Sequence, residues 1–208
     1  MDTFELKKEQ SKLANKIIVK DLFDKIKTIG GAECIALGEK ILAVVVVCEF
    51  PSLKMIEKKT YLLSSPLPYK PGYQAYREMP ALMEAYNQLS EEPDILLVKG
   101  FGINHPRKFG MAAHLGLALN QPTIGVTQKN IVGKVEKGKI IFQNDIVGFE
   151  ITTKEHANPV YVSPGHGVSL GSALDLVSKI ILPPHKMPEP LHISHKIAKK
   201  KVNDKIKE

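Results

Sequence analysis

Lys99, His105 and Arg107 lie close together in the segment DILLVKGFGINHPRKFG, residues 94–110. The apolar run that ends at Val98 predicts a buried strand, and Lys99 is the first polar side chain beyond it. Strand ends beside glycine-rich loops are where open α/β sheets usually carry their binding and catalytic groups. All three side chains can donate hydrogen bonds to an anionic ligand. The segment therefore predicts a functional site at this strand end.

The overall charge also favours an anionic partner. The chain has 208 residues, with 29 Lys and Arg against 22 Asp and Glu, and a formal net charge of +7. Charge alone leaves nucleic acid, a membrane surface and simple solubility as explanations. The hydrophobic content of 43% is enough for one full core. We therefore expect a single domain over residues 1–208, and a monomer.

Cysteine usage and the apolar runs predict a cytoplasmic protein that enters no membrane. The two cysteines, Cys34 and Cys48, lie inside apolar strand-like runs, as thiols in a reducing compartment do. The chain starts MDTFELKKEQ, without a hydrophobic signal region. The longest apolar stretch, ILAVVVVCEF from Ile41, is roughly half the length of about 20 residues that a membrane helix needs.

The first part of the chain predicts a helix followed by antiparallel strands. Apolar residues at helical spacing predict an amphipathic helix over residues 4–26. Three β-rich runs within residues 28–63 are separated by short turns and predict an antiparallel meander. A proline-rich loop follows, and residues 76–90 predict a helix with Pro80 near its first turn.

The middle of the chain alternates strand and helix. A strand ending at residue 98, a helix over 110–120 and a strand over 122–127 imply a right-handed crossover between parallel strands. The whole order predicts a ribonuclease H-like α/β fold, a mixed sheet of three antiparallel strands plus parallel crossovers, flanked by helices. In that architecture the first strand lies beside the fourth, so Glu33 and Lys99 should be near neighbours.

The last third of the chain is less regular. Residues 134–154 predict a pair of hairpin strands, residues 158–166 a short strand entering a turn, and residues 168–181 a helix. Residues 195–208 predict a basic C-terminal helix or tail, with six lysines from Lys196 to Lys207. A solvated helix face explains this charge run more simply than a dedicated phosphate-binding strip.

Several blocks of the sequence resemble signatures of the endonuclease V family. They are PYKPGYQAYREMPAL, KGFGINHPRKFGMAAHLGL, PTIGVTQKNIVGK, NPVYVSPGH and MPEPLHISH, in the family's order and spacing. The resemblance implies a ribonuclease H-like nuclease that binds Mg²⁺ and recognises deoxyinosine in DNA or inosine in RNA. It also implies hydrolysis of the second phosphodiester bond on the 3′ side of the lesion, in DNA repair or RNA processing.

The resemblance implies a set of catalytic and metal-binding positions. Glu33 stands where the family has a metal-binding aspartate, and Glu78 keeps the family's glutamate. Hard Mg²⁺ takes such carboxylate oxygens, and a bound cation activates water and holds the scissile phosphate. His105 and His166 match histidines of the family, and we expect His105 to face the cleft and donate to a phosphate oxygen.

Two replacements fall in the same implied site. Lys99 stands where the family's fourth strand ends in aspartate, and Gln128 stands where its fifth strand ends in lysine. A protonated ammonium cannot ligate a divalent cation and repels it. Lys129 is one position late and on a continuing strand would point to the opposite face. Three further departures are Gly167, Gly171 and His192.

These departures predict that metal binding is weak or absent and that cleavage is weakened or lost. Lys99 has two interpretations. It either replaces the metal by pairing with Glu33 and Glu78, which would otherwise repel each other, or it extends to solvent past the strand end. Neither leaves an obvious Mg²⁺ site.

The positions that recognise the base are better preserved. In the family a Pro-Tyr-x-Pro-Gly loop acts as a wedge beside the lesion, and the matching residues here are Pro68, Tyr69, Lys70, Pro71 and Gly72. An aromatic side chain can replace the stacking lost when a base is flipped out. Hypoxanthine is read by main-chain groups in a tight pocket, and the matching positions are Gly72, Gly100, Gly102 and Gly125, with Ile131 nearby.

Three further polar residues lie near the predicted site, and the two basic ones have two interpretations. Arg107 and Lys108 either extend the phosphate contact or are surface charges at the start of the next helix. His114 is expected to pack or cap, without binding a ligand.

Three functions follow as hypotheses. The favoured one is a protein that binds DNA or RNA containing deoxyinosine or inosine and cleaves it weakly or not at all. The alternative is an active Mg²⁺-dependent endonuclease of the family. A scaffold that binds no nucleic acid is the third, and the retained glycines and Tyr69 argue against it.

Overall fold

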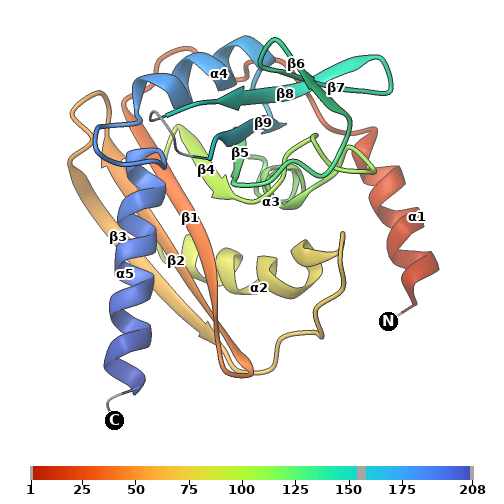
Figure 1. Cartoon of the computed structure of the whole chain (residues 1–208). Helices are drawn as coiled ribbons and strands as arrows, with labels where there is room; N and C mark the ends of the chain where they lie inside the picture. Colours follow the sequence, from red (N-terminus) through yellow and green to blue (C-terminus); the bar gives the residue numbers. More distant parts are fainter. Residues whose placement is uncertain (1, 154–157, 207–208) are drawn as a thin grey trace.

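The computed structural model describes residues 2–153 and 158–206. Within these residues it contains one mixed sheet with helices on both faces (Figure 1). The strands are β1 (Thr28–Leu37), β2 (Lys40–Glu49), β3 (Met55–Leu63), β4 (Ile95–Lys99), β5 (Thr123–Thr127), β6 (Lys134–Glu136), β7 (Lys139–Phe142), β8 (Asp145–Ile151) and β9 (Val160–His166). The helices are α1 (Thr3–Ala14), α2 (Gln74–Tyr86), α3 (Met111–Leu119), α4 (Leu170–Lys179) and α5 (Glu189–Ile206).

The strand order confirms the predicted mixed sheet. It is β3-β2-β1-β4-β5-β9-β8-β7-β6, in which β1–β3 form the predicted antiparallel meander. β4 runs parallel to β1 and to β5, so the predicted parallel crossovers are present. The register pairs Ala32 of β1 with Val98 of β4, which brings the next residues, Glu33 and Lys99, side by side where β4 ends.

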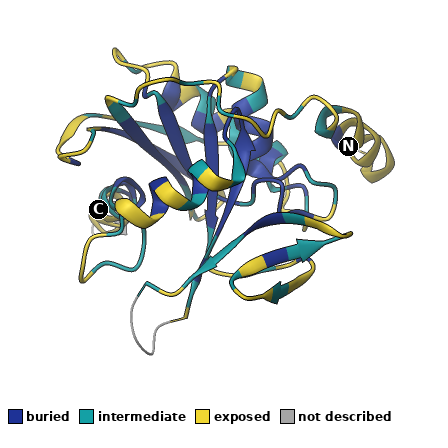
Figure 2. Cartoon of the chain, turned by 90° about the horizontal axis from the view of Figure 1, so that it is seen from above, coloured by how far each residue is buried: buried dark blue, intermediate teal, exposed yellow. Residues whose placement is uncertain are grey.

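Two apolar layers cover the sheet. Valines of β2 alternate between them, with Val44 and Val46 on one face and Val45 on the other. The first layer holds α4 and α5, and the second holds α2 and α3. Seen from above, the central strands β2, β4 and β5 are buried along nearly their whole length, whereas the edge strand β3 is intermediate or exposed (Figure 2). Residues 41–48 of β2 are all hydrophobic because this part of the strand is covered on both sides.

Helix α1 is shorter than the sequence predicts. It ends at Ala14 rather than near residue 26, and Asn15 caps it. The following segment instead makes backbone hydrogen bonds far along the chain, from Leu22 N–H to the Gly167 carbonyl and from Gly167 N–H to the Ile18 carbonyl. These long-range bonds override the helical periodicity of the segment.

Three other predicted boundaries differ. Pro80 lies in the second turn of α2, because that helix begins at Gln74. Residues 134–151 form three short strands, and β9 continues through the expected turn to His166. The C-terminal helix begins at Glu189 rather than at residue 195, and its buried residues include Leu191 and Ala198. Its first turns are therefore part of the core.

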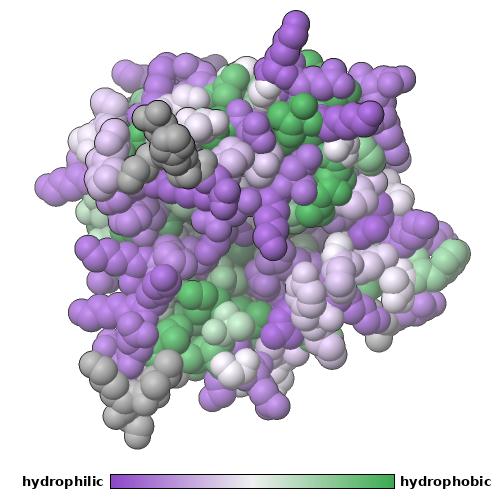
Figure 3. All heavy atoms as spheres, in the orientation of Figure 1, coloured by the Kyte–Doolittle hydropathy of each residue, from purple (hydrophilic) through white to green (hydrophobic). Residues whose placement is uncertain are grey.

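The surface matches the polar composition. Hydrophilic side chains dominate the face seen in Figure 3, and apolar side chains form only scattered patches there. Among the described residues, none of the helices is both long enough and apolar enough to span a bilayer.

Candidate functional site

Glu33, Lys99 and His195 form a polar cluster beside the middle of β1, at the point where β4 ends, and it is called here the Glu33 cluster. The Lys99 ammonium donates to Glu33 Oε1 in an ion pair. His195 Nδ1 lies 2.7 Å from the same oxygen and 3.4 Å from Lys99 Nζ. The Glu33 side chain is fully buried, whereas Lys99 and His195 keep about a third of theirs exposed. The cluster is thus a buried carboxylate covered by two side chains that reach solvent.

A close contact between β1 and α5 places His195 over Glu33. A Cβ at Gly31 would lie 2.4 Å from the Pro190 carbonyl carbon, so only glycine lets the start of α5 approach β1. Leu191 is buried in the core beside it. His195 follows one helical turn later, which brings its ring to the end of β4.

The two carboxylate oxygens of Glu33 are in different environments. Oε1 takes both partners, while Oε2 is buried and has no hydrogen-bond partner among the described residues. A buried carboxylate is unfavourable unless it is paired, and Lys99 supplies the compensating charge. Of the two interpretations of Lys99, the geometry therefore matches pairing with Glu33, not extension into solvent alone.

Glu78 is near the cluster but makes separate contacts. It lies on α2, on the opposite face of the sheet from α5, and its Oε2 accepts a hydrogen bond of 2.8 Å from Gln74. Burial raises the pKa of the Glu78 carboxyl, Gln74, Arg77 and Lys99 oppose the rise, and Glu33 adds to it. Lys99 thus acts on Glu78 through space, and its direct partners are Glu33 and His195.

The residues around Glu33 do not fit a bound Mg²⁺. In residues 2–153 and 158–206, no three His, Cys, Asp or Glu side chains are arranged to hold a metal ion. The Lys99 ammonium already lies against the carboxylate oxygen that would be a ligand. Its charge repels a divalent cation at that point.

Gln128 and His166 lie outside the cluster. β5 ends at Thr127, so Gln128 and Lys129 are exposed residues of the following loop, and strand alternation does not apply to them. His166 pairs with Thr123 at the beginning of β5, whereas Lys99 pairs with Val126 near its end. Burial lowers the pKa of His166, and its Nδ1 accepts a hydrogen bond of 3.4 Å from the Ile18 amide. The structure does not bring His166 to Glu33.

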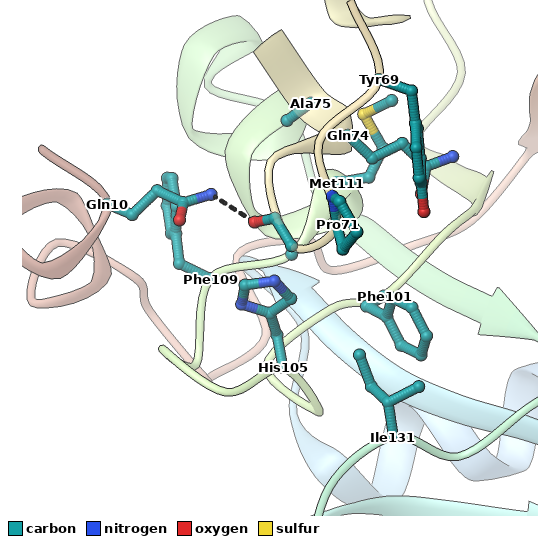
Figure 4. A pocket seen from close by; sticks show the side chains of 12 residues that line it. Gln10, Tyr69, Pro71, Gln74, Ala75, Phe101, His105, Phe109, Met111 and Ile131 are labelled. Carbon is teal, nitrogen blue, oxygen red and sulfur yellow. Dashed lines mark hydrogen bonds between the residues drawn. The ribbon is translucent and has the colours of Figure 1, made fainter. Parts of the chain in front are cut away.

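A cavity of about 180 Å³ lies beside the loop of residues 68–72 and is called here the Tyr69 pocket. It is smaller than the roughly 300–1,000 Å³ of sites for drug-sized ligands, so it suits one planar ring system. Figure 4 shows Tyr69, Phe101 and Ile131 on one side and Gln10 and Phe109 on the other. The remaining lining residues are Pro71, Gly72, Gln74, Ala75, His105, Gly110 and Met111.

Two exposed apolar side chains border this pocket. Tyr69 is 62% exposed and Ile131 is 48% exposed, and both line the pocket. Exposed aromatic surface at a pocket mouth is available to stack on a planar ligand. Lys70 points toward α1, where its Nζ donates to Thr3 Oγ1 at 3.3 Å, and Pro68 lines a separate cavity with Leu6.

His105 lies at the bottom of the Tyr69 pocket. Burial, with Arg107 nearby, lowers its pKa to about 4, so the imidazole is neutral at pH 7. Its Nδ1 accepts a hydrogen bond of 3.3 Å from the Arg107 amide, and a backbone hydrogen bond with Gly72 opposes the fall of its pKa. Lys108 forms an exposed ion pair with Asp145, so it belongs to the surface. His114 packs against Tyr76 and Phe109, as expected.

Three of the predicted base-reading glycines are required by protein packing. An added Cβ would lie 2.0 Å from the Pro164 oxygen at Gly102 and 2.5 Å from the Gly100 oxygen at Gly125. At Gly100 it would lie 2.7 Å from Met111 Cβ. The close backbone approaches therefore occur within the protein itself, and these glycines make the fold around the pocket possible.

Two residues of these sites were not predicted from the sequence. His195 lies in the MPEPLHISH block, where our prediction considered only His192. Gln10 is one helical turn after Leu6, and a polar residue on the buried stripe of an amphipathic helix signals a partner. Both positions can be seen in the sequence, but the sequence does not reveal which residue each side chain contacts.

Comparisons with known proteins agree on one family. The family model described as Endonuclease V matches residues 11–196. Endonuclease V of Dictyoglomus turgidum is 35% identical over 207 residues, which covers 96% of this chain and 90% of that protein.

Solved structures show the same fold. Human ENDOV superposes with a TM-score of 0.89 at 25% identity, covering 99% of this chain and 100% of that chain. Endonuclease V of Ciona intestinalis, in complex with a 24mer DNA containing an inosine followed by a ribo-adenosine, superposes with a TM-score of 0.87. It is 26% identical and covers 97% of this chain and 98% of that chain.

Proposed function

The chain belongs to the endonuclease V family, and on that basis we propose that it recognises deoxyinosine or inosine in DNA or RNA while its Mg²⁺-dependent hydrolysis is weakened or lost. The observation that carries this proposal is the Lys99 ammonium held against Glu33. The expected role of the protein is then to bind the modified strand, with cleavage of the second phosphodiester bond 3′ to the lesion slow or absent.

The Tyr69 pocket supports recognition of a base. Tyr69 is exposed at the pocket mouth and can stack on a base that has left the helix, which is worth about 1–3 kcal/mol. His105 lines the pocket as a neutral imidazole that shares a hydrogen bond with the Gly72 backbone, so it supports the loop beside the base. The Ciona intestinalis relative was crystallised with DNA containing inosine, which supports this ligand class.

The contacts of the Glu33 cluster support the second part of the proposal, that metal-dependent hydrolysis is weakened or lost. In this family a divalent cation supplies the activated water and holds the phosphate. Here Lys99 and His195 share Glu33 Oε1, and Glu78 is engaged by Gln74. Lys99 and His195 both reach solvent, so they can contact a backbone phosphate that approaches the end of β4.

An active Mg²⁺-dependent inosine endonuclease is the second candidate. It is favoured by the retention of both Glu33 and Glu78, and by Glu33 Oε2, which has no hydrogen-bond partner among the described residues. In this alternative the lysine moves away when metal and nucleic acid bind together.

The test combines binding and nicking on the same labelled strands, single and double, with and without inosine. We expect salt-sensitive binding that prefers inosine without added metal, and little nicking with Mg²⁺ or Mn²⁺. Tyr69→Ala should weaken binding of the inosine strand by about 1–3 kcal/mol. Equal affinity for strands with and without inosine would contradict the recognition proposal.

A control separates the two candidates. If the protein nicks the inosine strand with Mg²⁺, Glu78→Gln should abolish nicking, and the endonuclease alternative is then correct. Nicking that survives Glu78→Gln would come from a contaminating nuclease.

A further inference from the structure

Helix α1 lies at the edge of the molecule, away from the sheet, in both Figure 1 and Figure 2. Its described buried residues are Leu6 and Gln10. Gln10 is only 1% exposed, although its side chain carries an amide that needs hydrogen-bond partners. A helix with so little apolar packing that buries a glutamine must derive part of its attachment from that amide.

Gln10, Arg107 and the Gly72 carbonyl form a closed set of hydrogen bonds, called here the Gln10 clamp. Gln10 Nε2 donates to the Gly72 carbonyl at 3.2 Å, as Figure 4 shows. Arg107 Nε donates to Gln10 Oε1, and Arg107 Nη2 donates to the Gly72 carbonyl at 2.6 Å. The Arg107 guanidinium also lies 4.5 Å from the centre of the Tyr73 ring. Each polar atom of the Gln10 amide therefore has a partner; Gly72 lines the Tyr69 pocket, and Arg107 lies behind it and holds the same Gly72 carbonyl.

The clamp holds the loop that forms one side of the Tyr69 pocket. Gly72 has a φ of +77°, and a Cβ there would lie 2.9 Å from Arg107 Nη2. The positive φ favours glycine at this position, and its missing side chain lets the guanidinium lie directly against the turn. Pro71, next to Gly72, lines the pocket with Tyr69 and Gln10.

The rest of α1 is attached to the same stretch of chain. The Tyr73 hydroxyl donates to the Thr3 carbonyl at 3.4 Å, and the Tyr76 hydroxyl donates to Glu9 Oε2 at 2.9 Å. These bonds run from α1 to the segment that follows the loop. The helix is thus fixed to the loop and the start of α2, not to the sheet.

We propose that Gln10 is a positioning residue that sets how closely the Tyr69 pocket fits its base. This inference rests on the proposed function. Hypoxanthine differs from guanine only in lacking the 2-amino group, so a pocket that excludes guanine must keep its wall close to that edge. A loop released from the clamp would leave space for the extra group. The clamp should therefore control discrimination between the two bases more than overall affinity, which comes from phosphate contacts.

The main test compares Gln10→Met with Ser11→Ala. Methionine keeps the length and unbranched shape of glutamine but can form neither hydrogen bond. Ser11 is exposed on the same helix and bonds only its own helix backbone, at Lys7, so it is the matched control. Dissociation constants are measured for strands that carry inosine or guanosine at the same position. We expect the preference for inosine to fall about tenfold in Gln10→Met and to stay unchanged in Ser11→Ala.

A second readout needs no nucleic acid. Hydrogen exchange of the Tyr73 amide, which bonds the Lys70 carbonyl, should be faster in Gln10→Met than in Ser11→Ala. Gln10→Glu is the backup variant, because glutamate still accepts from Arg107 but, when ionised, cannot donate to Gly72. It should give an intermediate loss of preference if Gln10→Met folds poorly.

The outcomes separate the inference from the proposed function. An unchanged inosine preference in a folded Gln10→Met protein overturns the role of the clamp. A wild-type protein that binds both strands equally overturns the proposed function, and faster Tyr73 exchange in Gln10→Met would then show the clamp to be structural only.

Discussion

The Glu33 cluster and the Tyr69 pocket differ in how firmly the fold determines their residues. At the cluster, Lys99 is a partly exposed side chain at a strand end, and the register of β1 and β4 does not depend on it. Next to the pocket lining, Gly102 and Gly125 are packed directly against backbone atoms of Pro164 and Gly100, with no room for a Cβ. A single substitution can therefore change the chemistry at the Glu33 cluster, whereas the backbone that supports the pocket does not tolerate a side chain at these two glycines.

Because packing alone explains the glycines, they are weaker indicators of function than side chains that packing does not require. The glycines around the pocket are needed for packing whatever the pocket binds. Tyr69 is different, because it is 62% exposed and packing does not require an aromatic ring there. Tyr69 and the buried Gln10 therefore support base recognition more strongly than the glycines do.

The largest expected effect comes from returning a carboxylate to the cluster. Lys99→Asp removes the competing ammonium and adds an oxygen ligand beside Glu33, so Mg²⁺-dependent nicking of an inosine strand should rise roughly 1,000-fold. Single-turnover nicking rates with increasing Mg²⁺ measure it.

Lys99→Met is the control for that change. It removes the charge without supplying a ligand, so it should leave nicking low and reduce stability because Glu33 loses its ion pair. Equal nicking by both variants would mean that Lys99 only obstructs the site. No gain with Lys99→Asp, alone or with Glu33→Asp and Gln128→Lys, would mean that the site's backbone has diverged as well.

The substitution Gly102→Ala tests whether the backbone beside the Tyr69 pocket tolerates a side chain. Gly102→Ala places a Cβ 2.0 Å from the Pro164 oxygen, so the free energy of unfolding should fall by about 3 kcal/mol or more. Denaturant unfolding monitored by circular dichroism measures the loss. A stable Gly102→Ala protein with unchanged base preference would show that the wall tolerates movement.

Acid should weaken the aromatic packing behind the pocket. Burial lowers the pKa of His114 to about 4, and its usual value is 6.5, so the unfolded chain binds the proton more readily. Stability therefore falls as pH decreases from 6.5 to 4 and loses nothing more from this group below 4. The expected loss is about 3 kcal/mol by pH 4, since each pKa unit is worth about 1.4 kcal/mol.

His114→Gln isolates this contribution. The wild type should lose about 3 kcal/mol of its stability advantage over the variant between pH 7 and pH 4. A pH-independent difference between the two proteins would show that His114 is not held neutral by burial.

The smallest expected effect is at Gly171, a family difference away from both sites. It lies in α4, and no atom is within 4 Å of an added Cβ. Gly171→Ala should stabilise the protein by about 0.5–1 kcal/mol through helix propensity. Thermal unfolding measures it, with base preference unchanged as the internal control. A loss of stability would contradict the open space at this position.

The sequence predicted the sheet better than the side-chain partners. The meander and the adjacency of Glu33 and Lys99 followed from strand order, which local patterns reveal. The end of α1 did not, because it depends on hydrogen bonds between Ile18, Leu22 and Gly167. The roles of His195 and Gln10 also depend on distant partners, which spacing along one helix cannot identify.

The pairing of Lys99 with Glu33 also affects how the chain can evolve. No single nucleotide change converts a lysine codon into an aspartate codon, so the route passes through asparagine or glutamate. Lys99→Asn would leave the buried Glu33 carboxylate without its cation, and Lys99→Glu would add a second acid beside it. Each intermediate costs stability before any metal-binding carboxylate is regained. Natural selection therefore meets a barrier in that direction, and a lineage that has acquired this lysine will tend to keep it.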